Sequence, residues 1–394
     1  MVGYYGFLDH NIVMDGTAAT LDVADRSVQS EIPATAARFA MPNTLHQSEL
    51  DRKFRSIWDF GRVALVGCCA TNNGLSVLAA PVLSAPETDA LKPHLIDGAY
   101  VMDVDTMSTL AKELGATPVQ VELDHPVGSP TGPAHYELEI AIRPYCISTT
   151  KQRGVGLLDI SGFSLFTPEE QAAQLSMLSY ALNSAHQKLS KSGLNIDLAS
   201  STTGYGFYLW NRHEGLDEDA SLFCLMTVAL AHMALQYREV RATFAPAVRA
   251  CFGIGPHYTY FRPDHATGMG GDYIVGDVTI ILARLIDYVK SRQIMISGFN
   301  RADGNGRAVG TEEFLEISCQ IFNDLQIIKI GDSAISGVSR YLTGPRNKDG
   351  TYENRKREII DKHGFKHYAY NAKLNISLTD EGQLYLGRQE AYAA

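Results

Sequence analysis

The sequence lacks the features that mark nucleic-acid-binding, membrane-spanning and secreted proteins. Its 34 lysines and arginines are outnumbered by 44 aspartates and glutamates, which gives a formal net charge of −10 and no basic surplus to neutralise phosphates. No uninterrupted apolar run reaches the roughly 18 residues that span a bilayer, and the N-terminus lacks a signal-peptide pattern. We therefore expect a cytoplasmic protein that binds neither nucleic acid nor a membrane.

The cysteines and histidines also form no recognisable metal-binding or disulfide pattern. None of the six cysteines has CxxC spacing, and none of the twelve histidines belongs to an HExxH motif. Scattered cysteines in apolar surroundings are typical of core thiols in a reducing compartment. His232 lies on the apolar side of a predicted helix, and we expect it to be a core residue.

The chain is long enough for more than one hydrophobic core, with 394 residues of which 45% are hydrophobic. Residues 124–135 are rich in proline and glycine, as linkers are. We place a domain boundary there. The prediction is an N-terminal α+β domain of unknown role over residues 1–130, a second domain over 136–300, and a C-terminal helix and β-hairpin extension over 301–394.

Hydrophobic periodicity predicts an α+β sheet in the second domain, covered by helices on one face. A half-buried strand is expected at Tyr136–Ile142. Thr167, Pro168 and Glu170 form the capping box of a helix that ends near residue 190. The order strand–helix–strand–strand–helix–strand–helix–strand predicts a ferredoxin-like core, with elements at 155–159, 168–190, 196–198, 205–210, 218–237, 249–254, 277–289 and 293–297.

The stretch 155–166 combines a carboxylate with a glycine turn. Its apolar run indicates a buried strand that ends at Asp159, and Gly162 then turns the chain toward the next helix. A carboxylate can hold a divalent cation, and the free amides of such a turn can hold phosphate. The pair therefore suits a metal-bound polyphosphate, although an aspartate before a glycine turn is also common as a plain cap.

Five segments, taken in order, resemble the class III nucleotidyl cyclase homology domain, the family of adenylate and guanylate cyclases. The resemblance covers about residues 150–300 and implies a palm-type, ferredoxin-like fold. It also implies a phosphorus–oxygen lyase reaction, in which the 3′-hydroxyl of a nucleoside triphosphate attacks its own α-phosphorus and releases pyrophosphate. The segments are Leu157–Phe163, Thr203–Tyr208, Cys251–Gly255, Gly276–Leu285 and Gln293–Ser297.

The resemblance also implies a site shared between two chains. In the family, two aspartates hold two metal ions, and an asparagine and an arginine come from the partner, so a homodimer or a heterodimer with another cyclase-like chain is implied. Arg284 matches the transition-state arginine. Asp159 matches the first ligand of Mg²⁺ or Mn²⁺. The phosphate-binding turn falls on Ile160, Ser161, Gly162 and Phe163.

Four positions depart from the family pattern, and all of them belong to the active site. The second metal-binding aspartate falls on Tyr205, and the ribose-orienting asparagine falls on Ile280. The two base-selecting positions fall on Ser201 and near Tyr273. A tyrosine hydroxyl, with a reference pKa of about 10, cannot replace a carboxylate that two metals share. Such a loss costs several kcal/mol, or about a hundredfold to a thousandfold in rate.

The expected function is therefore that of a nucleotide-binding protein of cyclic-nucleotide signalling, with weak or no cyclase activity. Its ligand would be a nucleoside triphosphate or a cyclic nucleotide. One alternative is an active cyclase with an unusual base or metal preference, in which Asp272 or Asp277 approaches the site and supplies the missing ligand. Another is a structural dimerisation module. The sequence leaves open whether the protein is an enzyme and which base it binds.

Overall fold

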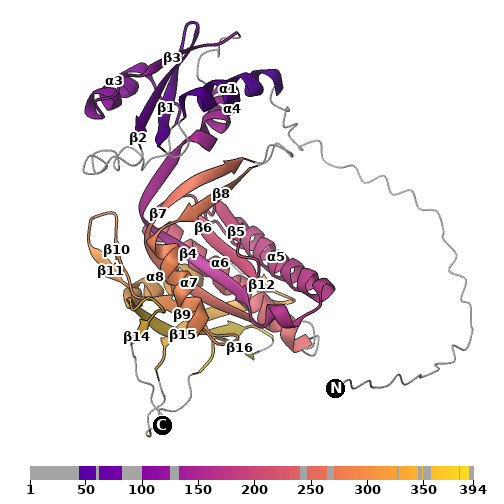
Figure 1. Cartoon of the computed structure of the whole chain (residues 1–394). Helices are drawn as coiled ribbons and strands as arrows, with labels where there is room; N and C mark the ends of the chain where they lie inside the picture. Colours follow the sequence, from indigo (N-terminus) through magenta and orange to yellow (C-terminus); the bar gives the residue numbers. More distant parts are fainter. Residues whose placement is uncertain are drawn as a thin grey trace, which may run out of the picture. The chain divides into compact units, whose positions relative to one another are not determined.

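In the computed structural model, the described residues all lie in one compact unit, Pro42–Ala394. The division into three domains stays a prediction. The chain has an α+β fold, as predicted (Figure 1). The described residues are 44–58, 62–81, 100–124, 133–239, 246–263, 270–325, 328–344, 348, 356–380 and 382–389.

The first sheet is antiparallel, with its strands in the order β1-β2-β3. Helices α1 and α4 share a buried cluster with one set of its side chains, which includes Leu65 and Val77. Helix α3 packs on another set, which includes Val66 and Leu78. The elements are α1 (Thr44–Ile57), β1 (Val63–Thr71), β2 (Gly74–Pro81), α3 (Val104–Glu113), β3 (Val119–Glu122) and α4 (Pro133–Ile142).

Helix α4 occupies the segment for which a strand was predicted, so the prediction at Tyr136–Ile142 is wrong. Its buried residues are Leu138, Ala141 and Ile142, which recur at the i, i+3, i+4 spacing of a helix face. Seven residues are too few for the alternating pattern to separate a strand from a helix.

The ferredoxin-like core is confirmed. Four neighbouring strands stand in the order β7-β4-β6-β5, and each neighbouring pair is antiparallel. The chain order is β-α-β-β-α-β, which defines this fold. Its elements are β4 (Ile147–Ile160), α5 (Pro168–Lys191), β5 (Leu198–Thr202), β6 (Gly206–Asn211), α6 (Leu216–Glu239) and β7 (Val248–Pro263).

Seven further strands extend this sheet to eleven, whereas β10 and β11 form a separate two-stranded sheet. Strand β9 is parallel to β7, and the predicted C-terminal hairpin is present as β14 and β15, which join the sheet through β9. The elements are β8 (Gly270–Val275), α7 (Asp277–Leu285), η3 (Ile286–Tyr288), β9 (Ile294–Ser297), β10 (Asn300–Ala302), β11 (Ala308–Gly310), α8 (Thr311–Asp324), β12 (Lys329–Ile330), β13 (Ser333–Leu342), β14 (Arg357–Ile360), β15 (Lys366–Leu378) and β16 (Gly382–Leu386).

Helices cover both faces of the large sheet, so the prediction of helices on one face is wrong. Helices α5, α6 and α8 bury Leu158 and its neighbours in the main core. Helix α7 packs Leu282 against Leu157 and Cys251, whose side chains belong to a separate cluster. Successive residues of a strand point to opposite faces, which explains why Leu157 and Leu158 enter different clusters.

Helix α6 lies in the main core and is strongly apolar. Its stretch Leu216–Gln236 is long and apolar enough to cross a membrane by length and composition, with a hydropathy of 1.3. However, 83% of that window is buried inside the protein. A core helix passes the same test, so the stretch is weak evidence for a membrane span.

Candidate functional site

Asp159 lies at the end of β4, opposite Gly206 of β6 and Arg249 of β7. It is only 7% exposed. The Nε of Arg249 donates a hydrogen bond to its Oδ1 at 3.2 Å. A second nitrogen of Arg249, Nη1, donates to the backbone oxygen of Val289 at 3.2 Å. The charge of the Asp159 carboxylate is therefore neutralised by a guanidinium, which a hydrogen bond to Val289 also holds in place.

Tyr205, at the position predicted for the second metal ligand, makes aromatic and backbone contacts. Its ring centroid lies 5.6 Å from that of Phe163. Its backbone oxygen accepts a hydrogen bond from the amide of Ile160 at 3.0 Å. The side chain is 53% exposed. The turn next to Asp159 thus presents a phenol where a second carboxylate was expected.

These residues do not fit a two-metal centre. Hard divalent cations take six or more oxygen ligands, with carboxylates supplying the charge. Here the one carboxylate is already paired with Arg249, and its neighbour Tyr205 offers a phenol. Within the described ranges, no three His, Cys, Asp or Glu side chains form a group that could hold a metal ion. We derive no chemical step through Mg²⁺ or Mn²⁺.

The predicted phosphate-binding turn has the geometry of an anion-binding loop in only part of its length. Gly162 adopts a left-handed conformation with φ of +69°, which favours glycine. The amide of Ser161 donates to the backbone oxygen of Ala247 at 2.9 Å, and that of Ile160 is also used within the protein. Among the described residues, the amides of Gly162 and Phe163 donate no backbone hydrogen bond, so these two could hold an anion. The buried Oγ of Ser161 has no hydrogen-bond partner in the described part of the chain.

Arg284 faces a carboxylate of its own chain. Its Nε lies 3.7 Å from Oδ2 of Asp361, in the turn between β14 and β15. The same oxygen contacts Nε2 of His367 at 3.0 Å. The hydrogen bond from His367, helped by backbone amides that include that of Phe365, lowers the pKa of Asp361 to about 2. The arginine predicted to act in a partner's site is thus held near the C-terminal hairpin.

The other three predicted positions are dispersed. Ile280 lies exposed on α7, and Ser201 is half-buried on β5. Tyr273 pairs with Tyr260 of β7, whereas Asp159 pairs with Arg249 of the same strand. The two partners, Arg249 and Tyr260, are eleven residues apart along β7, a distance of roughly 35 Å. Within one chain, the structure does not bring Tyr273 to Asp159.

Asp272 and Asp277 also lie away from Asp159 along β7, since Asp272 pairs with Phe261 and Gly276, which precedes Asp277, lies against His257. Asp272 is buried and bonds to Nε of Arg212 at 2.6 Å and to Nη2 of Arg143 at 2.8 Å. Asp277 begins α7 just after the end of β8. The alternative in which one of them supplies the missing ligand within the chain is therefore wrong.

A buried charged cluster was missed by the sequence reasoning. Asp219 pairs with Nε of Arg301 at 2.7 Å, and Arg153 contacts Nε2 of His257 at 3.1 Å and Glu214 at 3.1 Å. Burial raises the pKa of Asp219 to about 7. Burial and the nearby Arg153 lower the pKa of His257 to about 3. These contacts join β4, α6, β7 and β10, and no sequence motif marks them.

Comparison with known proteins finds similarity in structure only. No family model and no curated protein matches the chain. It is similar to solved cyclase domains. The guanylyl cyclase Cya2 is 13% identical, with a TM-score of 0.35 over 59% of this chain and 95% of that one.

Two further solved structures give similar values. The adenylyl cyclase CyaB from P. aeruginosa is 13% identical, with a TM-score of 0.32 over 57% of this chain and 95% of that one. The guanylate cyclase domain of RhGC from Catenaria anguillulae, in complex with GTP, is 13% identical, with a TM-score of 0.33 over 57% of this chain and 97% of that one. Likenesses this low carry no functional argument.

Proposed function

We propose that the protein is a cyclase-like, nucleotide-binding protein of cyclic-nucleotide signalling, with weak or no cyclase activity. The contact between Arg249 and Asp159 carries this proposal. Cyclisation with two metals needs free carboxylates to bind them. The one carboxylate at this site is paired with a guanidinium, and Tyr205 stands where the second would be.

Nucleotide binding is proposed because the site retains groups that suit phosphate. The amides of Gly162 and Phe163 lie in a left-handed turn of the kind that binds anions. Arg249 lies beside this turn, and although Asp159 and Val289 engage its Nε and Nη1, a guanidinium carries five N–H donors, so it can bind a phosphate oxygen as well. A phosphate held in this way needs no bridging cation, so binding is proposed to be independent of divalent metal.

We further propose that the protein forms a dimer in the cytoplasm. Strands β7 and β8 carry exposed Tyr258, Tyr273 and Val275. Tyr258 and Val275 are cross-strand partners, and Tyr273 follows two positions away, so the three share one face. Exposed aromatic and aliphatic groups gathered in this way are typical of protein interfaces. Light scattering of the purified chain, compared with a Tyr273→Lys variant, tests this point.

Calorimetric titration with ATP, GTP, CTP and UTP, in EDTA and in Mn²⁺, tests the proposed function. We expect at least one triphosphate to bind with similar affinity in both. The variant Arg249→Met should bind it about tenfold more weakly or worse, because a charged hydrogen bond is lost. Arg307, which pairs with Asp303 on the surface, provides a matched control in Arg307→Met.

Two outcomes would overturn the proposal. Binding that requires Mn²⁺ and disappears in Asp159→Ala would favour an active metal site instead. No binding of any triphosphate by a folded protein would favour the structural dimerisation module.

A further inference from the structure

Lys188 and His232 form a polar contact between the two long helices of the main core. Lys188 lies in the last turn of α5, and His232 lies on α6. The Nζ of Lys188 is 2.9 Å from Nε2 of His232. The Oγ of Ser184, one turn earlier on α5, is 3.5 Å from the same nitrogen. The three side chains therefore converge at one point between the helices.

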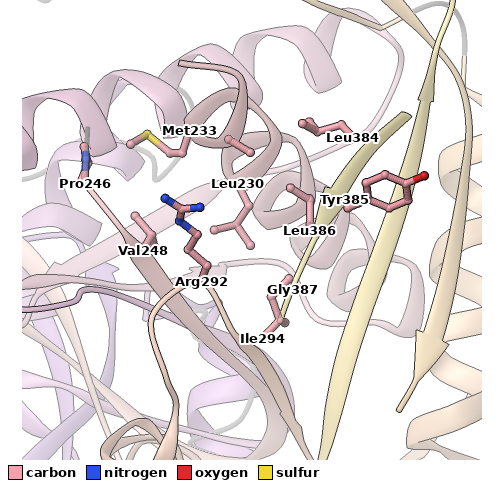
Figure 2. A pocket seen from close by; sticks show the side chains of 11 residues that line it. Leu230, Met233, Pro246, Val248, Arg292, Ile294, Leu384, Tyr385, Leu386 and Gly387 are labelled. Atoms are coloured by element: carbon pink, nitrogen blue, oxygen red, sulfur yellow. The ribbon is translucent and has the colours of Figure 1, made fainter. Parts of the chain in front are cut away.

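The imidazole of His232 faces α5 because the opposite side of α6 packs elsewhere. Leu230, Met233 and Ala234 line a cavity of about 240 Å³ against β16, and Figure 2 shows Leu230 and Met233 at this cavity. With 3.6 residues per turn, His232 lies roughly opposite these three residues around the axis of α6. It is only 9% exposed. The contact with Lys188 is therefore made where little water reaches the imidazole.

The partner of Lys188 supplies no negative charge. Burial and the nearby Lys188 lower the pKa of His232 to about 4, so the imidazole is neutral at pH 7. A neutral imidazole accepts a hydrogen bond but adds no charge that would hold a proton on the amine. Burial also lowers the pKa of Lys188 below its ordinary value of 10.5, and no described carboxylate offsets this effect. More of Lys188 is therefore free amine at pH 7 than of an exposed lysine.

The free amine of a lysine is a nucleophile, whereas the ammonium is not, because its lone pair is occupied by the proton. In the free amine, one N–H of Lys188 donates to Nε2 of His232, which holds the nitrogen in place. The side chain of Lys188 is only half-buried, so a small reagent can reach it from solvent. The site thus combines a nucleophilic nitrogen, a fixed position and access for a reagent.

We propose that Lys188 is a selective acylation site that reacts with small acyl phosphates. The nitrogen forms a bond to the acyl carbon, and the bond from this carbon to the phosphate oxygen breaks. Phosphate leaves with the electron pair of that bond, and the proton of the nitrogen passes to water. The product is a neutral amide, so acylation removes the positive charge beside His232. The site does not depend on the proposed nucleotide binding.

Incubation of the full chain with acetyl phosphate, followed by mass spectrometry of its peptides, tests the proposal. Lys191 lies three residues further along the same helix and is exposed, so it is a matched control within one protein. At a pH of about 7.5 we expect the initial rate of acetylation at Lys188 to be at least about threefold that at Lys191, because the rate follows the fraction of free amine. If Lys188 only fills space between the helices, its burial should make it the slower of the two, and that result would overturn the proposal.

Two variants of the half-buried Ser184 test the cause of this preference. Ser184→Asp places a carboxylate one turn before Lys188, at the i, i+4 spacing of a helical ion pair. The carboxylate should hold the proton on Lys188 and reduce its rate to about that of Lys191. Ser184→Asn has nearly the same size without the charge, so it should keep the preference for Lys188. An equal preference for Lys188 in the two folded variants would overturn the proposal.

Discussion

The ion pair between Asp159 and Arg249 predicts a measurable coupling energy. Asp159 and Arg249 have side-chain exposures of 10% and 25%. Exposed pairs contribute about 0.2–1 kcal/mol, and removing one partner of a fully buried pair costs about 3–5 kcal/mol. The observed contact lies between these cases, so we expect a coupling energy of about 1–2 kcal/mol.

A double-mutant cycle with Asp159→Asn, Arg249→Met and the double variant measures this energy. Urea denaturation gives the free energy of unfolding of each protein. The four values are comparable provided that the slope of this free energy against urea concentration is the same in all of them. The surface pair of Asp303 and Arg307 gives a matched cycle, and its coupling should be smaller because Arg307 is exposed. A coupling at Asp159 no larger than at Asp303 would refute the reasoning, because the carboxylate would then be free to bind a metal.

Three further predictions follow from the site and the core. Gly162→Ala should lower the free energy of unfolding in urea by about 1–2 kcal/mol, because the φ of Gly162 is left-handed, and should weaken triphosphate binding. Its control is Gly193→Ala, at the end of α5, where φ is +97°. This variant should lose similar stability without a change in the triphosphate affinity measured by calorimetry. Burial lowers the pKa of His232 from 6.5 to about 4. Between these pH values the unfolded chain binds one proton more than the folded chain, so the free energy of unfolding falls as the pH drops through that range. In urea unfolding, His232→Gln should show a smaller fall of this free energy with pH, and an unchanged fall would exclude His232 as the cause. Tyr205→Asp alone should give no cyclic product by mass spectrometry, because Arg249 still pairs with Asp159, and turnover by this single variant would contradict the account.

Elements defined by local sequence were predictable. Helix α5 begins where its capping box indicated: the amide of Thr167 donates to Glu170 at 2.9 Å, and the amide of Glu170 donates to the Thr167 hydroxyl at 3.4 Å. The ferredoxin-like order followed from the alternation of such elements. The helix at Pro133–Ile142 was missed because only its packing on the first sheet, through Leu138 and Ile142, separates it from a strand.

The candidate site was predictable only in its local part. Asp159 at a strand end and Gly162 in a turn are features of one short segment. The partner of Asp159 comes from a strand 90 residues away, and only the register of β4 on β7 makes Arg249 its neighbour. The contact of Arg284 with Asp361 likewise depends on the pairing of the C-terminal hairpin with β9. Such partners carry no signal in the sequence around either residue.

Product analysis by mass spectrometry tests the central claim most directly. The purified protein, shown to be folded, is incubated with ATP, GTP, CTP or UTP, each with Mg²⁺ or Mn²⁺. The account predicts at most a few turnovers to cyclic monophosphate in any combination, because Arg249 pairs with the Asp159 carboxylate and Tyr205 lies at the position predicted for the second carboxylate. A cyclic monophosphate formed over many turnovers, and absent with the Asp159→Ala variant, would contradict it.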